Sequence, residues 1–148
     1  YLLKKEGLLK EGDLVINIYD PSRTTIFHEV SHGRVYSLPR SFLQYWEQIN
    51  NSGVPRKKAY SHKDQFLSTA GFGYARAYGA SDIHEDIATM VEFISRFKQL
   101  KKKITAKNKS IVKPYLNIYL QKADLLLKFG LITSTNHAVF RHWFKKMK

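Results

Sequence analysis

The sequence predicts an α+β fold that is mainly helical, with a small sheet near the N-terminus. Residues 13–19 alternate apolar and polar side chains and are rich in branched residues, which is typical of a strand. Several later segments repeat apolar residues at helical spacing. The 148 residues are 43% hydrophobic and 14% aromatic, which is enough for the core of a single domain spanning 1–148.

The first predicted helix follows the strand directly. A polar turn ends the strand and offers Asp20 or Ser22 as the helix N-cap. The helix then runs from about Arg23 to Tyr36. This placement puts the strand immediately before the most distinctive motif of the chain, and an extended peptide could dock along such a strand edge.

The rest of the chain is predicted to be helices joined by loops. Residues 51–58 form a basic loop, and residues 61–79 form a glycine-containing loop with one short helical turn. Four helices are expected, over 41–50, from Asp82 to the lysine tract, over 114–128 with Gly130 as its cap, and over 135–147.

The charge of the chain restricts its partners. A formal net charge of +13 favours an acidic partner, and the densest run of lysines lies between Lys98 and Lys113. This tract could contact an anionic surface or polymer, although no nucleic-acid-binding signature accompanies it. The chain has no cysteine, which excludes disulfides and thiolate metal sites. No apolar run reaches membrane-spanning length.

The most informative motif is His28-Glu29-Val30-Ser31-His32. Positions i and i+4 share one face of a helix, so the rings of His28 and His32 can converge on one metal ion. Glu29 lies about 100° further round the helix, where it can accept a proton from a water molecule at the metal. The motif therefore predicts a zinc site with a built-in general base.

A catalytic zinc site needs a third protein ligand and an open position. The most suitable region is the start of the second long helix, where His84, Glu85 and Asp86 are consecutive. Spacing alone does not choose between these three residues. The remaining histidines, His62, His137 and His142, are interpreted as surface residues or as histidines with other partners.

Residues 77–91, AYGASDIHEDIATMV, resemble the second motif of the anthrax lethal-factor-type metallopeptidases. The proline-proline endopeptidases are similar. In this group a tyrosine follows the HExxH motif, and seven residues later a glutamate opens a helix with an alanine one turn in. The matching positions here are Tyr78, Glu85 and Ala88. The two motifs together cover about a third of the chain.

The resemblance implies a zincin-like zinc endopeptidase, secreted or in the cell envelope, that acts on a peptide or protein substrate. In it, His28, His32 and Glu85 bind Zn²⁺, Glu29 is the general base for a zinc-activated water, and Tyr78 stabilises the oxyanion. The glycine that follows Tyr78 is expected to help present its ring.

The sequence departs from the family pattern at one position. The family usually has a second acidic residue four positions after the ligand glutamate, and this chain has Thr89 there. Two alternatives remain. Thr89 leaves open an inactive zincin-like domain that binds a peptide or a protein, and the lysine tract leaves open a basic module that binds an anionic polymer.

Overall fold

The structure is a computed structural model that describes residues 23–60 and 72–147, and every regular element in these ranges is helical. The predicted α+β class is therefore wrong: no strand or sheet occurs in the described part of the chain. The alternating segment 13–19 lies outside the described residues. Alternation is a local pattern, whereas a sheet needs a second strand to pair with, and the described segments supply none.

Most of the helices and helical turns are short, and tight connections join them. In chain order they are α2 (Arg23–Val35), α3 (Arg40–Asn51), α4 (Arg56–Ala59), η1 (Ala77–Ala80), α5 (Ile83–Ser95), α6 (Phe97–Leu100), η2 (Lys101–Lys103), α7 (Ala106–Val112), η3 (Lys113–Tyr115), α8 (Leu116–Lys128) and α9 (Ser134–Lys145).

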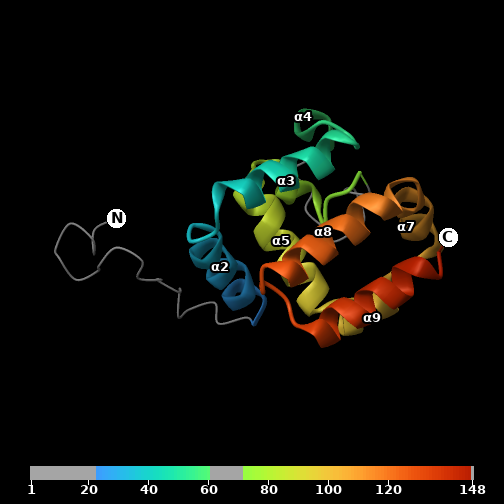
Figure 1. The fold of residues 1–148 in the computed structure, drawn as a ribbon. Helices are drawn as coiled ribbons and strands as arrows, with labels where there is room; N and C mark the ends of the chain where they lie inside the picture. The colour runs from blue at the N-terminus through green and yellow to red at the C-terminus, as the bar shows by residue number, and fades with distance from the viewer. Residues whose placement is uncertain (1–22, 61–71, 148) are drawn as a thin grey trace.

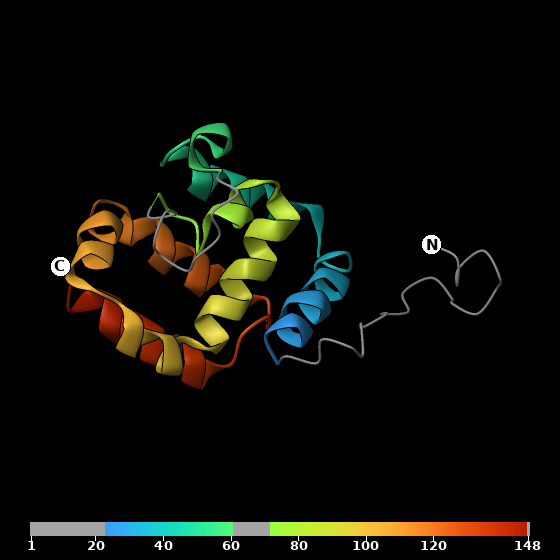
Figure 2. The same cartoon turned by 180° about the vertical axis from the view of Figure 1, so that it is seen from behind.

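Helix α5 is the centre of the arrangement. It runs between α2 on one side and the α8–α9 pair on the other, as two opposite views show (Figure 1, Figure 2). Helix α3 packs against α8, and α6 packs against α9. As a result, α5 presents one face to α2 and a different face to the main core.

The main core is rich in aromatic side chains. Phe93 and Phe97 meet Phe140 and Phe144 of α9, with Phe97 and Phe140 packed edge to face at 4.9 Å between ring centroids. All four side chains are fully buried. Burying one such ring contributes roughly 1.5–3 kcal/mol, so this cluster fixes α9 firmly against the C-terminal end of α5.

The predicted helices agree with the observed ones to within a few residues. Helix α5 begins after Asp82, whose carboxylate accepts hydrogen bonds from the backbone N–H groups of His84 and Glu85. The chain leaves α8 through Gly130, whose φ of +68° favours glycine. The expected short turn before α5 is η1. The expected loop over 51–58 is partly wrong, because the helical turn α4 lies within it.

The lysine tract is helical rather than extended. It forms α6, η2 and α7, and Thr105 starts α7 through a reciprocal capping box with Asn108. Among residues 23–60 and 72–147, none of the helices combines the length and the apolar character that crossing a membrane requires.

Candidate metal centre

Helix α2 aligns the two histidines of the HExxH motif. His28 and His32 are four residues apart, so both rings lie on the face that packs against α5. Their Nε2 atoms are 3.1 Å apart, and the rings meet edge to face. On the opposite side of this helix, Phe27 and Val30 are exposed. The motif helix therefore directs both imidazoles inward.

Helix α5 supplies the third donor. The Asp82 cap fixes the first turn, and Glu85 in that turn points at the histidines of α2. Its Oε2 atom is 3.0 Å from Nε2 of His28, and its Oε1 atom is 3.3 Å from Nε2 of His32. His28, His32 and Glu85 thus form a cluster that could hold a metal ion. Of the three adjacent candidates on α5, the geometry selects Glu85.

The spacing of the donors fits a small metal ion. A tetrahedral ion with ligands about 2.0–2.1 Å away holds its donors roughly 3.3–3.4 Å apart. The two Nε2 atoms are 3.1 Å apart, and each lies 3.0–3.3 Å from a different oxygen of Glu85. Oε2 of Glu85 is buried and has no hydrogen-bond partner, although it lies close to His28. A buried carboxylate oxygen without a hydrogen-bond partner, beside two converging imidazoles, is what a cation site would use.

The electrostatic environment of His28 also favours a cation. Burial alone would lower the pKa of His28, but the carboxylates of Glu92, Glu85 and Glu29 outweigh this effect and raise its pKa above the ordinary value. Glu29 is half-buried and belongs to this group of acids, directly beside the first ligand in sequence. Three carboxylates around one imidazole create a negative field that a bound cation would neutralise.

Tyr78 lies at the edge of the same cluster. Its hydroxyl donates a hydrogen bond to the carboxylate of Glu85, and its ring is 38% exposed. Partial burial and the carboxylates of Glu85 and Asp82 raise the pKa of Tyr78, so the phenol remains a protonated donor at neutral pH. The guanidinium of Arg76 lies over the ring, 5.9 Å from its centroid.

Gly79 is required for close packing rather than for an unusual backbone angle. A Cβ atom added at Gly79 would lie 2.5 Å from Oγ1 of Thr89, which is far too close, whereas its φ is not in the left-handed region. Thr89 is buried and donates hydrogen bonds to the carbonyl oxygens of Glu85 and Asp86. Thr89 therefore sets how closely the turn that carries Tyr78 sits on α5.

Asp86 follows the ligand glutamate but faces away from the metal cluster. It is fully buried, and its carboxylate accepts hydrogen bonds from Nζ of Lys122 at 2.9 Å, Nε1 of Trp46 at 2.7 Å and Nδ2 of Asn50 at 2.9 Å. Lys122 is also fully buried and donates to the carbonyl of Gly73. This buried pair joins α3, α5 and α8 directly behind Glu85.

Arg56 extends this network to η1, the turn that carries Tyr78. Its guanidinium donates hydrogen bonds to the carbonyl oxygens of Gly79 and Asp82, and it forms ion pairs with Asp86 and Glu47. The backbone that follows Tyr78 is therefore attached to the same buried charges that anchor α5. Burial lowers the pKa of Lys122, and the Asp86 carboxylate opposes this effect.

The other histidines lie outside the cluster. The ring of His84 stacks on Tyr36, with 5.2 Å between centroids. His137 pairs with Asp124, which also pairs with Arg141. His142 lies in the last turn of α9, and His62 falls outside the described residues. The interpretation of His137 as a histidine with another partner agrees with its pairing to Asp124.

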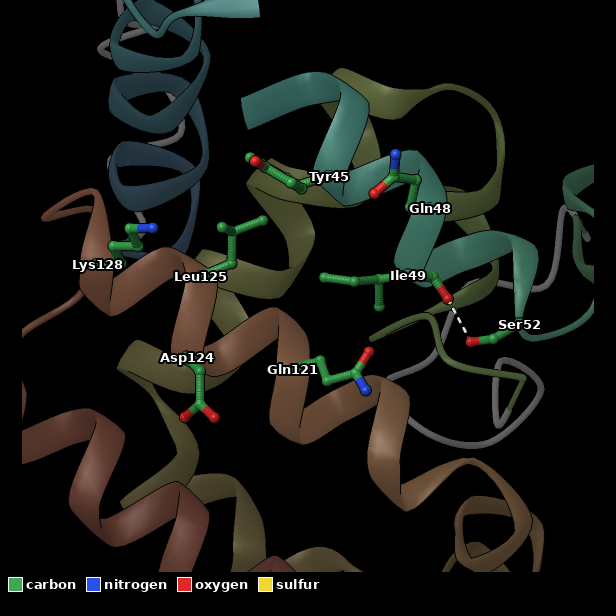
Figure 3. Close-up of a pocket in the computed structure, with 8 residues that line it drawn as sticks. All are labelled: Tyr45, Gln48, Ile49, Ser52, Gln121, Asp124, Leu125 and Lys128. Atoms are coloured by element: carbon green, nitrogen blue, oxygen red, sulfur yellow. Dashed lines mark hydrogen bonds between the residues drawn. The ribbon is translucent and has the colours of Figure 1, made fainter. Parts of the chain in front are cut away.

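A separate groove lies between α3 and α8 (Figure 3). Tyr45, Gln48 and Ile49 face Gln121 and Leu125 across it, and no residue of the metal cluster lines it. Its one carboxylate is already paired with basic side chains of α9. The groove therefore lacks the converging histidine and carboxylate side chains that distinguish the metal cluster.

The roles of two buried acids near the site do not follow from the sequence alone. Asp86 is a candidate third ligand by its position, but its actual partner Lys122 is 36 residues away, so no local pattern reveals the pair. Glu92 was not considered, although an acid between Val91 and Phe93 in an apolar helix is a recognisable signal of a buried, paired carboxylate. Glu92 is buried against His28 and two arginines.

Comparison of the chain with protein-family models, curated proteins and solved structures finds no significant match.

Proposed function

We propose that this chain is a zinc-dependent endopeptidase. The observation that carries the proposal is the convergence of donor atoms from His28, His32 and Glu85, with an acid next to the first ligand and a phenol bonded to the third. The proposal agrees with the resemblance of the two sequence motifs to lethal-factor-type metallopeptidases.

The donor set supports zinc over the common alternatives. Two imidazoles and one carboxylate form a ligand set that catalytic zinc sites use, with the fourth position left for water or substrate. Calcium and magnesium prefer sites made only of oxygen ligands. The side chains of His32 and Glu85 retain 19% and 16% exposure, so the cluster is accessible to solvent on one side.

The mechanism assigns one task to each nearby residue. Zinc at this site would lower the pKa of a water molecule to about 7 and polarise a peptide carbonyl. Glu29 would accept a proton from the water that attacks the carbonyl carbon and would then deliver this proton to the leaving amine. Tyr78 donates a hydrogen bond to the carbonyl oxygen as negative charge develops on it.

The metal assignment predicts the effects of three alanine variants. Wild-type protein is expected to hold about one zinc per chain after dialysis, and His28→Ala and Glu85→Ala are expected to lose most of it. His84→Ala is the matched control, because His84 is adjacent to the ligand but stacks on Tyr36 instead. Elemental analysis gives the readout. Zinc loss in His84→Ala with full retention in Glu85→Ala would reverse the choice of third ligand.

The role of Tyr78 predicts a selective loss of rate. Tyr78→Phe removes the donor and keeps the ring, so kcat is expected to fall roughly thirty- to a thousandfold with KM nearly unchanged. Zinc content and melting temperature should barely move, because the ring is 38% exposed. Tyr45→Phe, an exposed tyrosine of the α3–α8 groove, is the control. A normal kcat in well-folded Tyr78→Phe would remove this residue from the mechanism.

A second candidate function follows from the distribution of charge. Residues 1–92 contain eleven basic and eleven acidic residues, whereas residues 93–148 contain fourteen basic residues and the single acid Asp124. Lys109 of α7 lies over the ring of Trp143 in α9, so the lysine tract and the end of α9 share one end of the molecule (Figure 1). Salt-dependent binding to heparin or DNA without any peptide cleavage would favour a polyanion-binding module.

A further inference from the structure

Glu92 faces the ring nitrogen of His28 that the metal cluster does not use. Nε2 of His28 points to Glu85, whereas Nδ1 lies 3.7 Å from Oε2 of Glu92. This distance is longer than a hydrogen bond. Nδ1 is buried, and within the described residues it has no hydrogen-bond partner. The two nitrogens of one imidazole thus face two carboxylates of the same helix.

Helix geometry explains how one ring reaches both carboxylates. Residues seven positions apart on a helix differ by only about 20° in direction and lie roughly 10 Å apart along the axis. Glu85 and Glu92 therefore project from the same face of α5, two turns apart. His28 on α2 lies between them, because α2 packs along this face.

The carboxylate of Glu92 is held in place from its other side. Its Oε1 atom accepts a hydrogen bond from Nη1 of Arg96 at 3.2 Å, and its Oε2 atom lies 3.5 Å from Nη2 of Arg76. Glu92 is only 2% exposed. Burying a carboxylate at this depth is costly unless charges compensate it, and two guanidinium groups do so here.

We propose that Glu92 is a positioning residue for the metal site, which accepts a hydrogen bond from Nδ1–H of His28 and directs Nε2 at the metal. This inference rests on the proposed function. When a metal occupies Nε2, the neutral imidazole carries its proton on Nδ1, and a small movement of either side chain closes the remaining gap. Carboxylates behind ligand histidines fix the ring and raise its basicity.

Position 89 has a different role in this chain, and the buried acid stands at position 92. The resemblance leads to an acid at position 89, four residues after Glu85. In this chain Thr89 is fully buried, bonds to two helix carbonyl oxygens and packs under Gly79. Position 89 supports the turn that carries Tyr78, and the carboxylate stands one turn further along the same face of α5.

Zinc affinity tests the proposal without reference to catalysis. Glu92→Gln keeps the shape of the side chain and removes its charge, so the Kd for zinc alone is expected to rise about ten- to a hundredfold in competition with a chromophoric chelator. Asp124→Asn is the matched control, because Asp124 also has two basic partners but lies far from the cluster in sequence and fold. Its zinc affinity should equal that of the wild type.

The outcomes separate this inference from the proposed function. An unchanged zinc Kd in Glu92→Gln that melts normally without metal overturns the positioning role and leaves the metal site intact. Failure of the wild type to bind zinc overturns the metal site and this inference with it. Glu92→Asp, which restores the charge on a shorter side chain, should recover part of the lost affinity.

A spectroscopic measurement on the zinc-loaded wild type covers the case in which Glu92→Gln does not fold. The Nδ1–H proton of His28 should give a downfield resonance that is protected from exchange with solvent, because it is buried and bonded to a carboxylate. Rapid exchange of this proton would show that Glu92 accepts no hydrogen bond from it, and would overturn the proposal.

Discussion

Replacement of Glu29 by glutamine is expected to lower peptide cleavage by at least about a hundredfold while zinc remains bound. Glutamine has nearly the same shape as glutamate but cannot accept the proton of the attacking water. Glu29 is not one of the three clustered donors, so the metal site should stay complete. Turnover of a peptide library and zinc content, measured on the same preparation, give the two readouts.

The controls for Glu29→Gln separate a chemical effect from a structural one. Asp124→Asn removes a carboxylate from the surface of α8 and should cleave peptides at the wild-type rate. A melting temperature of Glu29→Gln close to that of the wild type excludes misfolding. Undiminished turnover in this variant would refute the hydrolytic mechanism. Absence of cleavage by zinc-loaded wild type would instead favour an inactive, peptide-binding form of the fold.

Lys122→Met is expected to reduce the free energy of unfolding by about 3–5 kcal/mol. Removing the ammonium leaves the carboxylate of Asp86 fully buried, with Trp46, Asn50 and the partly exposed Arg56 as its remaining partners. The carbonyl of Gly73 also loses its donor. The free energy of unfolding of an ordinary domain is only about 5–15 kcal/mol, so this single change removes a large part of it.

Urea unfolding measures this effect against a matched substitution. Lys128→Met changes an exposed lysine of the same helix and should alter stability by no more than about 0.5 kcal/mol. A double variant that combines Asp86→Leu with Lys122→Met should recover part of the loss, because no unpaired charge remains. Recovery should be incomplete, since Trp46 and Asn50 then lack their acceptor. Equal effects of Lys122→Met and Lys128→Met would contradict the structural role of the buried pair.

The local parts of the fold could be predicted from the sequence. Helices α2, α5, α8 and α9 follow from apolar spacing and from capping residues such as Asp82 and Gly130, which act over a few residues. The fold class could not be predicted in this way. The alternation in 13–19 carries no information about a pairing partner, and the described residues contain no strand.

The convergence of the two histidines could be predicted from the sequence, whereas the roles of the residues around them could not. His28 and His32 lie on one helix, so their convergence follows from helical geometry alone. The choice of Glu85 over its neighbours depends on how α5 rotates against α2, and only the family resemblance selected it before the structure did. The roles of Asp86 and Glu92 depend on residues up to 40 and 64 positions away. Such long-range pairs leave no local pattern.

The contact between Gly79 and Thr89 has a consequence for how this sequence can diverge. No side chain fits at position 79 while the hydroxyl of Thr89 remains in place. A substitution at position 79 thus requires the hydroxyl of Thr89 to move or residue 89 to become smaller first, so the order of the two changes matters. The two positions form an epistatic pair, one on the turn that carries Tyr78 and one on the helix that carries Glu85.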